Sequence, residues 1–276
     1  TIFKQFCGGE TIAECDKTIK DLWKYKVGTI LDYSVEGKEG DEDFDRTRDE
    51  ILRTVERSNA EISIPFSVFK LTGVTSFSLL EKLNSKEELT AEEETKKLEL
   101  IDRVDRICKA AYEADTPVFI DAEESWIQDA IDEITEQMME TYNKERAIVY
   151  NTVQLYRWDR VEYIKALHKR AQERNYKPGL KLVRGAYMEK ERDRAEDRGY
   201  KSPIQPSKAA SDKDYDIALE YCTDHIDRFA ICAGTHNEKS SLYLTELMEK
   251  KSIAKNDERI YFAQLLGMSD HISFNL

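Results

Sequence analysis

The sequence predicts an α/β fold of the (β/α)8 barrel type, and three observations lead to this prediction. Short apolar runs alternate along the chain with longer segments of helical periodicity, a pattern typical of a parallel sheet covered by helices. The length of 276 residues suits one such barrel, for which about 250 residues is common. No G-x-G-x-x-G turn follows any of the apolar runs, so a doubly wound open sheet is the second choice.

The predicted helices share apolar residues at spacings of three and four. In the segment 11–25, Ile12, Cys15, Ile19 and Leu22 fall on one helical face. The segment 41–59 begins with acidic residues, which stabilise a helix N-terminus. Further helices are predicted over 95–114, 127–142, 160–174, 189–198, 212–225 and 238–250, with a charged arm of short helices over 75–94.

Seven strands are predicted between these helices, over residues 29–33, 61–71, 117–121, 148–156, 179–187, 229–235 and 260–266. The second is identified by the alternation of Ile62, Ile64, Phe66 and Val68. A closed barrel needs an eighth strand, so the last βα unit is expected to be missing from this chain. No change of composition marks a linker, and residues 1–276 are therefore predicted to form a single domain.

Composition excludes several classes of function. A formal net charge of −13 argues against nucleic-acid binding, and 35% charged residues indicate a soluble protein with water-exposed helices. No apolar run is long enough to span a bilayer, and no signal peptide opens the chain. The five cysteines form no C-x-x-C pair, which predicts reduced thiols and gives no zinc-binding arrangement.

The segment 179–187 carries the strongest sign of a binding site. In a strand, alternation would place Lys181, Val183, Gly185 and Tyr187 on one face. A lysine that points into a core is costly unless it meets an anion or a ligand, and Gly185 would let a flat ligand approach the backbone. We therefore expect a cofactor site here. The alternative is a barrel strand whose lysine extends along the strand to reach solvent.

Polar residues recur where the predicted strands end. In a parallel barrel the carboxyl ends of the strands face one rim, where active sites lie. Each residue has a simpler explanation by itself; Asp121, for example, could cap the following helix. Together they favour a site formed by Lys70, Asp121, Gln154, Lys181, Tyr187, Thr235, His236 and Gln264.

Several of these segments together resemble one family. They are the KLVRGAY run of residues 181–187, the DAE run of residues 121–123, the strand with Gln154, Thr235-His236-Asn237, the QLLGM run of residues 264–268, and the GETI run of residues 9–12. In matching order over nearly the whole chain, the sequence resembles proline dehydrogenase. The resemblance implies a distorted (β/α)8 barrel that binds FAD. It also implies that the flavoenzyme oxidises L-proline to Δ1-pyrroline-5-carboxylate, the first step of proline catabolism, and passes the electrons to a quinone.

The resemblance also implies roles for individual residues. Lys70 matches the lysine that pairs with the proline carboxylate, and Asp121 matches an active-site aspartate. Lys181 lies where many bacterial members carry an arginine near flavin N5, and Leu265 matches an apolar wall of the proline site. Tyr187 matches a position that lines both the flavin and the substrate.

Further cofactor-binding residues follow from the same resemblance. Gln154 matches the glutamine at the isoalloxazine edge, and Lys208 matches a loop lysine near the FAD phosphates. The others expected to contact the flavin are Ala122, Val183, Arg184, Gly185, Thr235 and His236.

The sequence departs from the family at both ends, and two alternative functions stay open. The family's N-terminal arm and its last strand and helix, whose arginines and tyrosine hold the carboxylate, are not found in residues 1–276. The alternatives are another FAD-binding barrel oxidoreductase, such as a methylenetetrahydrofolate reductase, and a non-catalytic barrel scaffold. A bacterial source implies a cytoplasmic protein or one peripheral to the inner membrane, and a eukaryotic source implies a mitochondrial one. The oligomeric state is not predicted.

Overall fold

The computed structural model describes residues 6–9, 11–32 and 40–276. In these residues, seven strands form one sheet in chain order, and every strand pairing that is defined is parallel. The strands are β1 (Ile30–Asp32), β2 (Phe66–Phe69), β3 (Val118–Ile120), β4 (Val149–Gln154), β5 (Gly179–Val183), β6 (Ala230–Gly234) and β7 (Ile260–Ala263).

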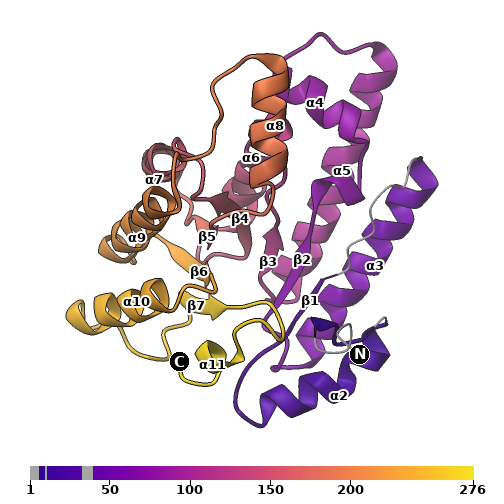
Figure 1. The fold of residues 1–276 in the computed structure, drawn as a ribbon. Helices are drawn as coiled ribbons and strands as arrows, with labels where there is room; N and C mark the ends of the chain where they lie inside the picture. Colours follow the sequence, from indigo (N-terminus) through magenta and orange to yellow (C-terminus); the bar gives the residue numbers. More distant parts are fainter. Residues whose placement is uncertain (1–5, 10, 33–39) are drawn as a thin grey trace. The chain divides into compact units, whose positions relative to one another are not determined.

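Helices alternate with these strands along the chain (Figure 1). They are α2 (Ile12–Trp23), α3 (Asp41–Ala60), the 3-10 helix η1 (Leu71–Gly73), α4 (Phe77–Ser85), α5 (Ala91–Glu113), α6 (Ser125–Tyr142), α7 (Arg160–Arg174), α8 (Met188–Arg198), α9 (Lys208–Asp224), α10 (Glu238–Lys250) and α11 (Asp270–Ser273). The predicted α/β fold of alternating parallel strands and helices is therefore confirmed. Among the described helices, none is both long and apolar enough to cross a membrane.

The chain divides into two compact units that share strand β4. The N-terminal unit is formed by the described residues between Gly9 and Asn143 together with Ile148–Asn151, and it therefore contains β1, β2, β3 and the start of β4. The C-terminal unit contains residues 6–8, Lys144–Ala147 and Thr152–Leu276, and therefore the end of β4 with β5, β6 and β7. Each unit buries apolar side chains of its own strands and helices.

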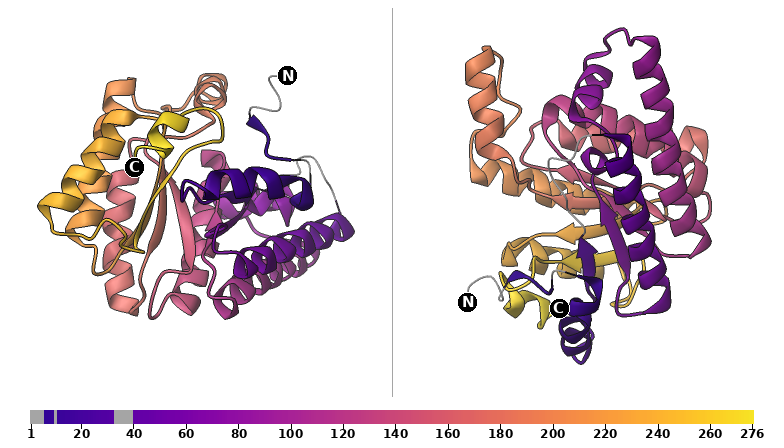
Figure 2. Two further views of the ribbon diagram at one scale, coloured as in Figure 1. Left: turned by 90° about the horizontal axis from the view of Figure 1, so that it is seen from below. Right: turned by 90° about the vertical axis from the view of Figure 1, so that its right-hand side faces the viewer.

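Aromatic rings form the core of the N-terminal unit. Phe66 on β2 stacks on Phe119 on β3 with ring centroids 4.3 Å apart, and Tyr150 on β4 meets both rings edge-on. All three rings are fully buried, so they stabilise the unit through area burial and ring geometry. Helices α3 and α5 run beside each other, and α3 also packs against β2 (Figures 1 and 2).

Strands β5, β6 and β7 organise the C-terminal unit. Lys181 on β5 is level with Cys232 on β6, which is level with Tyr261 on β7. The end of β4 is joined to β5 by a bond of 2.8 Å from Leu155 N–H to the Val183 carbonyl. Helices α9 and α10 lie next to each other and follow β5 and β6 in the chain (Figures 1 and 2).

Several predicted boundaries are wrong. The predicted strand 61–71 begins only at Phe66, because residues before it form a turn in which Ile64 N–H bonds the Glu61 carbonyl. Ile62 is consequently 82% exposed. Helix α5 begins at Ala91 rather than at residue 95, because Thr90 and Glu93 form a capping box that starts the helix there.

The strand predicted over 179–187 is also shorter than expected. It ends at Val183, and Gly185 adopts a φ of +134° in the turn that leads to α8. Only Lys181 and Val183 therefore share a strand face, while Gly185 is exposed and Tyr187 precedes α8. Strand β7 likewise ends at Ala263, so Gln264 and Leu265 follow it. Of the sequence motifs, Glu10 and Tyr33 lie outside the described residues.

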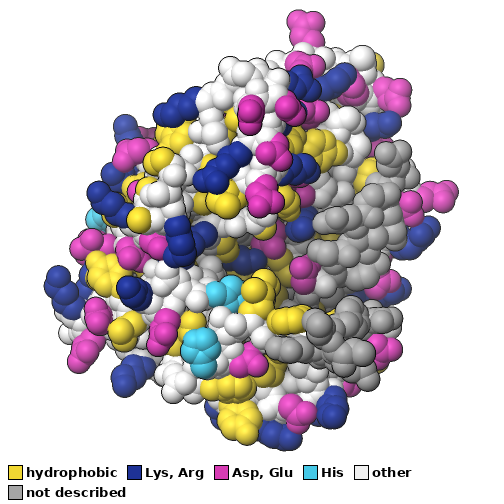
Figure 3. All heavy atoms as spheres, viewed as in Figure 1, with side chains coloured by type: hydrophobic (Ala, Val, Ile, Leu, Met, Phe, Trp, Pro, Cys, Tyr) yellow, Lys and Arg dark blue, Asp and Glu magenta, His cyan; other side chains and the backbone are white. Residues whose placement is uncertain are grey.

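Charges of both signs are mixed on the surface. On the face drawn in Figure 3, the Lys and Arg side chains of the described residues are interspersed with Asp and Glu and form no extended basic field. This distribution agrees with the formal net charge of −13. That face therefore offers no extended basic surface along which the phosphate backbone of a nucleic acid could bind.

Candidate functional site

Three predicted site residues follow paired strands of the N-terminal unit. Lys70 comes directly after β2, and Asp121 and Ala122 come directly after β3. Because Phe69 is level with Ile120, the two strand ends coincide, and Asp121 N–H donates to the Phe69 carbonyl at 2.9 Å. The structure therefore brings a lysine and an aspartate to neighbouring carboxyl ends of the sheet. Ala122, the next residue, is almost fully buried.

A buried carboxylate lies beside these residues. Glu123 is 4% exposed and accepts a bond of 3.2 Å from the backbone N–H of Thr72, and its second oxygen accepts from the Thr72 hydroxyl. Burial raises the pKa of Glu123 to about 7, although the bonds from Thr72 and the charge of Lys70 oppose the shift. The sequence included Glu123 in a motif but did not indicate its burial.

In the C-terminal unit, Gln154 lies at a strand end as predicted, whereas Lys181 is the central residue of β5 and Val183 is its last residue. Gln154 ends β4 and is buried, whereas Lys181 and Val183 on β5 are half-buried. Gly234 at the end of β6 is close to both, since a Cβ placed there would lie 3.0 Å from Val183 Cγ1 and 3.9 Å from Lys181 Cε. Because Gly234 has no side chain, the Lys181 stem and the Val183 methyl groups are less covered at this strand end.

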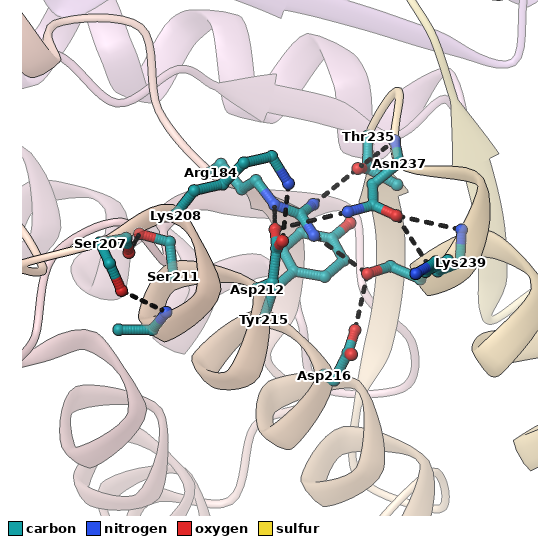
Figure 4. Close-up of polar contacts among 12 residues, drawn as sticks. Arg184, Ser207, Lys208, Ser211, Asp212, Tyr215, Asp216, Thr235, Asn237 and Lys239 are labelled. Atoms are coloured by element: carbon teal, nitrogen blue, oxygen red, sulfur yellow. Dashed lines mark hydrogen bonds and ion pairs between the residues drawn. The ribbon is translucent and has the colours of Figure 1, made fainter.

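Arg184 connects four elements of the C-terminal unit (Figure 4). Its Nε donates to Asp212 on α9 at 2.6 Å, its Nη1 donates to Thr235 after β6 at 2.7 Å, and its Nη2 bonds Ser240 on α10 at 3.0 Å. The guanidinium also lies over the ring of Tyr215, 4.3 Å from the centroid. The planar fork of arginine allows these three contacts at once, which a lysine could not make.

Lys208 is held by the same carboxylate. Its ammonium lies 2.6 Å from Asp212, at the (i, i+4) spacing within α9. Burial raises the pKa of Asp212, but the bonds from Lys208 and Arg184 outweigh it and hold this pKa below its usual value. Lys208 was predicted in a loop, and this is wrong. Ser207 caps the helix by accepting the Ala210 N–H, so α9 begins at Lys208 instead of Asp212.

The turn after β6 is fixed by its own polar residues. The Thr235 hydroxyl accepts from Arg184 and from Asn237 N–H, and Asn237 caps α10 through Lys239 N–H and Ser240 N–H (Figure 4). A hydroxyl has two acceptor positions, so these two bonds use both acceptor positions of Thr235.

His236 is held as a neutral imidazole. Leu265 N–H donates to its Nε2 at 3.4 Å, so Nδ1 carries the proton and donates to the Ser269 hydroxyl at 3.0 Å. Burial lowers the pKa of His236, which favours the same neutral form. The Leu265 side chain itself is 66% exposed.

Asp212, Tyr215 and Ser240 organise this network and were not predicted from the sequence. One signal was present: Lys208 and Asp212 are four residues apart, and they form a helical pair once Ser207 is recognised as the cap. Contacts between Arg184 and Ser240 depend on the packing of β5 against β6 and leave no local pattern in the sequence.

The fold and these strand ends define a barrel-type α/β protein that gathers polar and charged side chains at the carboxyl ends of its parallel strands. The chain matches the family model described as proline dehydrogenase over residues 15–276. It belongs to the proline dehydrogenase family.

Named relatives agree with this membership. The chain is 31% identical to the mitochondrial proline dehydrogenase 1 of Dictyostelium discoideum, over 100% of this chain and 56% of that protein. It is 30% identical to the carbapenem antibiotics biosynthesis protein CarD of Pectobacterium carotovorum, over 98% of this chain and 70% of that protein. The chain therefore spans only part of the length of the curated proteins that it matches.

Solved structures confirm the fold. Proline utilization A (PutA) from Bdellovibrio bacteriovorus, inactivated by N-propargylglycine, superposes with a TM-score of 0.85 over 98% of this chain and 29% of that chain, at 22% identity. PutA of Bradyrhizobium japonicum superposes with a TM-score of 0.77 at 20% identity, over 98% of this chain and 27% of that chain. The predicted barrel-type fold, with seven strands in the described residues, is thus confirmed.

Proposed function

We propose that the protein is a flavin-dependent proline dehydrogenase that oxidises L-proline to Δ1-pyrroline-5-carboxylate. The observation that carries this proposal is a lysine at the carboxyl end of β2 and another on β5, in a chain of the proline dehydrogenase family. The substrate is a carboxylate, and the acceptor gains negative charge during the reaction. Both therefore call for fixed cations.

The reaction removes two electrons and two protons from proline. The C–H bond of the ring carbon next to the amine breaks, its hydride leaves, the amine proton goes to solvent, and a C=N bond forms. FAD would supply the hydride acceptor. We assign Lys70 to the substrate carboxylate, because clamping that group fixes the reacting carbon in place. Asp121 next to it would attract the substrate ammonium before its proton leaves.

The C-terminal unit carries groups that suit FAD. Lys181 would stabilise negative charge on the reduced ring, and Lys208, placed by Asp212 at the start of α9, suits a phosphate. The Thr235 hydroxyl, the neutral His236 and the Gln154 amide suit the polar ring edge. Val183, Gly185, Tyr187 and Ala122 are assigned to the apolar surroundings of the flavin, and Tyr187 and Leu265 to the proline ring.

We assign residues 1–276 to one FAD-binding domain and a quinone to the role of electron acceptor. Quinones reside in membranes, so the protein would make peripheral membrane contact during turnover. The relatives from Dictyostelium discoideum and Arabidopsis thaliana are named as mitochondrial. A eukaryotic source would place this protein in the same compartment, and a bacterial source would place it in the cytoplasm or against the inner membrane.

Anaerobic titration of the purified full-length protein with L-proline tests the proposal. We expect a yellow protein whose flavin absorbance bleaches in proportion to the proline added. A yellow protein that proline does not bleach would support a different FAD-dependent barrel enzyme. A colourless protein that releases no flavin on denaturation would support a non-catalytic scaffold.

A further inference from the structure

Glu123 links two loops of the N-terminal unit through its side chain. Its carboxylate receives both donors of Thr72, the backbone N–H at 3.2 Å and the hydroxyl. Thr72 lies in η1, and Lys70 is at the N-cap position of this short helix, where its carbonyl accepts the Gly73 N–H. The position of Lys70 at the end of β2 is therefore connected to Glu123 across one turn of backbone.

The backbone of Glu123 is held by a buried chain of hydrogen bonds. Glu123 N–H donates to Gln128 at 2.8 Å, Gln128 donates to Asp132 at 2.8 Å, and Asn151 on β4 donates to the same Asp132 oxygen at 2.8 Å. Glu123, Gln128, Asp132 and Asn151 are each at most 5% exposed. Buried polar chains of this kind are rigid, because each lost contact leaves a desolvated group.

The other side of η1 is also fixed. A Cβ placed on Gly73 would lie 3.2 Å from the Thr47 methyl group, so the turn lies directly against α3. The turn that follows Lys70 is thus held between α3 and the Glu123 carboxylate. Its backbone makes few bonds of its own, since η1 is only three residues long.

We propose that Glu123 is a positioning residue for Lys70: it holds the η1 turn through Thr72 and so sets where the Lys70 ammonium meets the substrate carboxylate. The inference rests on the proposed function, because it assigns Lys70 to a carboxylate substrate. Glu123 need not touch the substrate for this role. Thr72 donates to its carboxylate, and the charges of Lys70 and the neighbouring Glu124 also act on it.

Thr72→Val tests the role without changing any charge. It removes the hydroxyl donor to Glu123 and keeps the size of the side chain. In the FAD-loaded full-length protein, we expect the KM for L-proline to rise about tenfold, with kcat and flavin content within about twofold of the parent. Thr72→Ser retains the hydroxyl, so its KM should equal that of the parent protein.

The Lys70→Ala background separates positioning from a general loss of structure. If Glu123 and Thr72 act through Lys70, Thr72→Val should cause no further rise in KM once Lys70 is absent. Glu93→Gln is the matched control, because Glu93 also accepts the backbone N–H of a threonine, in the capping box with Thr90 of α5. That variant should leave the KM unchanged.

Three results would overturn the inference. They are an unchanged KM in Thr72→Val, a rise that adds fully to that of Lys70→Ala, and a fall of kcat together with loss of flavin. Glu123→Gln supplies a further test. A lower KM in this variant, together with an unchanged KM in Thr72→Val, would mean that Glu123 acts on Lys70 through its charge alone and would also overturn the positioning role. Turnover of proline by the parent protein is measured first, so failure of the proposed function appears in the parent and failure of the positioning role only in the variants.

Discussion

Arg184 Nε donates to the Asp212 carboxylate at 2.6 Å, and this ion pair joins the residue after β5 to the N-terminal part of α9. The two side chains are 20% and 28% exposed, so the pair is shielded from water on most sides. Since Thr235 and Ser240 share the same guanidinium, one side chain fixes the turn after β6 and the start of α10 as well.

Replacing Arg184 should therefore destabilise the C-terminal unit. Arg184→Met removes three hydrogen bonds, one of them to a carboxylate, and should lower the free energy of unfolding by about 2 kcal/mol or more. Arg184→Lys keeps the charge but not the fork, and its stability should fall between those of the parent and the methionine variant. Urea unfolding followed by far-UV circular dichroism measures both. A change below about 0.5 kcal/mol for the methionine variant would show that the network contributes little.

Gly185 allows a close contact that no other residue permits. Its φ is +134°, and a Cβ placed there would lie 2.4 Å from the Tyr156 ring. Gly185→Ala should therefore cost about 2 to 3 kcal/mol of stability, through backbone strain and overlap together.

Gly199→Ala is the matched control for that substitution. Gly199 has a φ of +70°, and a Cβ placed on it would meet no atom within 4 Å, so this variant reports the strain alone. The same urea measurement should give about 1 kcal/mol for this variant. Equal losses in the two variants would mean that the Tyr156 ring moves aside at no cost.

Glu123 should make stability depend on pH in an unusual direction. Its pKa is about 7 in the folded protein against 4.5 for an unperturbed glutamate, so the folded state holds the proton more tightly. The stabilising contribution is complete below pH 4.5 and is lost as the pH rises to 7, up to about 3 kcal/mol. As the pH rises between these two values, the free energy of unfolding of Glu123→Gln should therefore increase relative to that of the parent.

Asp159 provides a control of opposite sign for that measurement. Burial raises its pKa, but the Arg160 and Arg157 guanidinium groups outweigh burial and lower it to about 2. Its stabilising contribution is therefore lost as the pH falls below the unfolded value, and Asp159→Asn should alter the profile only in acid. A Glu123→Gln profile parallel to that of the parent from about pH 5 to 8 would contradict the burial of an ionisable carboxyl.

Lys70→Ala should weaken proline binding and leave flavin content unchanged. A contact between lysine and carboxylate that exists in both the ground and the transition state appears mainly in KM. Steady-state kinetics and the flavin-to-protein absorbance ratio provide the two readings. A collapse of kcat at constant KM, with full flavin, would rule out the assignment of Lys70 to the carboxylate.

Lys181→Met should lower the midpoint potential of the bound flavin. If Lys181 lies beside flavin N5, its charge stabilises the reduced anion, and about 1.4 kcal/mol of lost stabilisation corresponds to 30 mV for two electrons. Lys181→Arg keeps the charge and should be tolerated. Reductive titration of both variants against a reference dye decides the question, because an unchanged potential in the methionine variant indicates that the lysine only reaches solvent.

The sequence predicted local features better than boundaries. Lys70 and Asp121 were correctly placed at strand ends, because an apolar run followed by a charge is a local signal. Lys181, also expected at a strand end, is instead the central residue of β5. The alternation that extended β5 to Tyr187 failed because Gly185 leaves the extended conformation. The alternation at Ile62 failed in the same way, at the turn closed by Ile64.

Long-range contacts could not be read from the sequence. Arg184 was expected to contact a flavin, and nothing near it in the chain indicated that Asp212, Thr235 and Ser240 would use its three nitrogens. The buried state of Glu123 was equally hidden, because an acidic run such as that of residues 121–124 is usually a solvated helix start. Burial depends on how α6 and η1 pack, which is a property of the assembled unit.

The order of the strands has a consequence for biosynthesis. In the part of the chain that the structure describes, each strand after β1 lies next to the strand that precedes it in the sequence, so each new strand finds its partner already synthesised. A nascent chain that emerges from its N-terminus can extend the sheet one strand at a time without waiting for a distant segment. Until the next strand arrives, the newest one exposes a row of unpaired backbone groups at the growing edge. That edge is where a chaperone, or an unwanted second copy of the chain, would bind during synthesis.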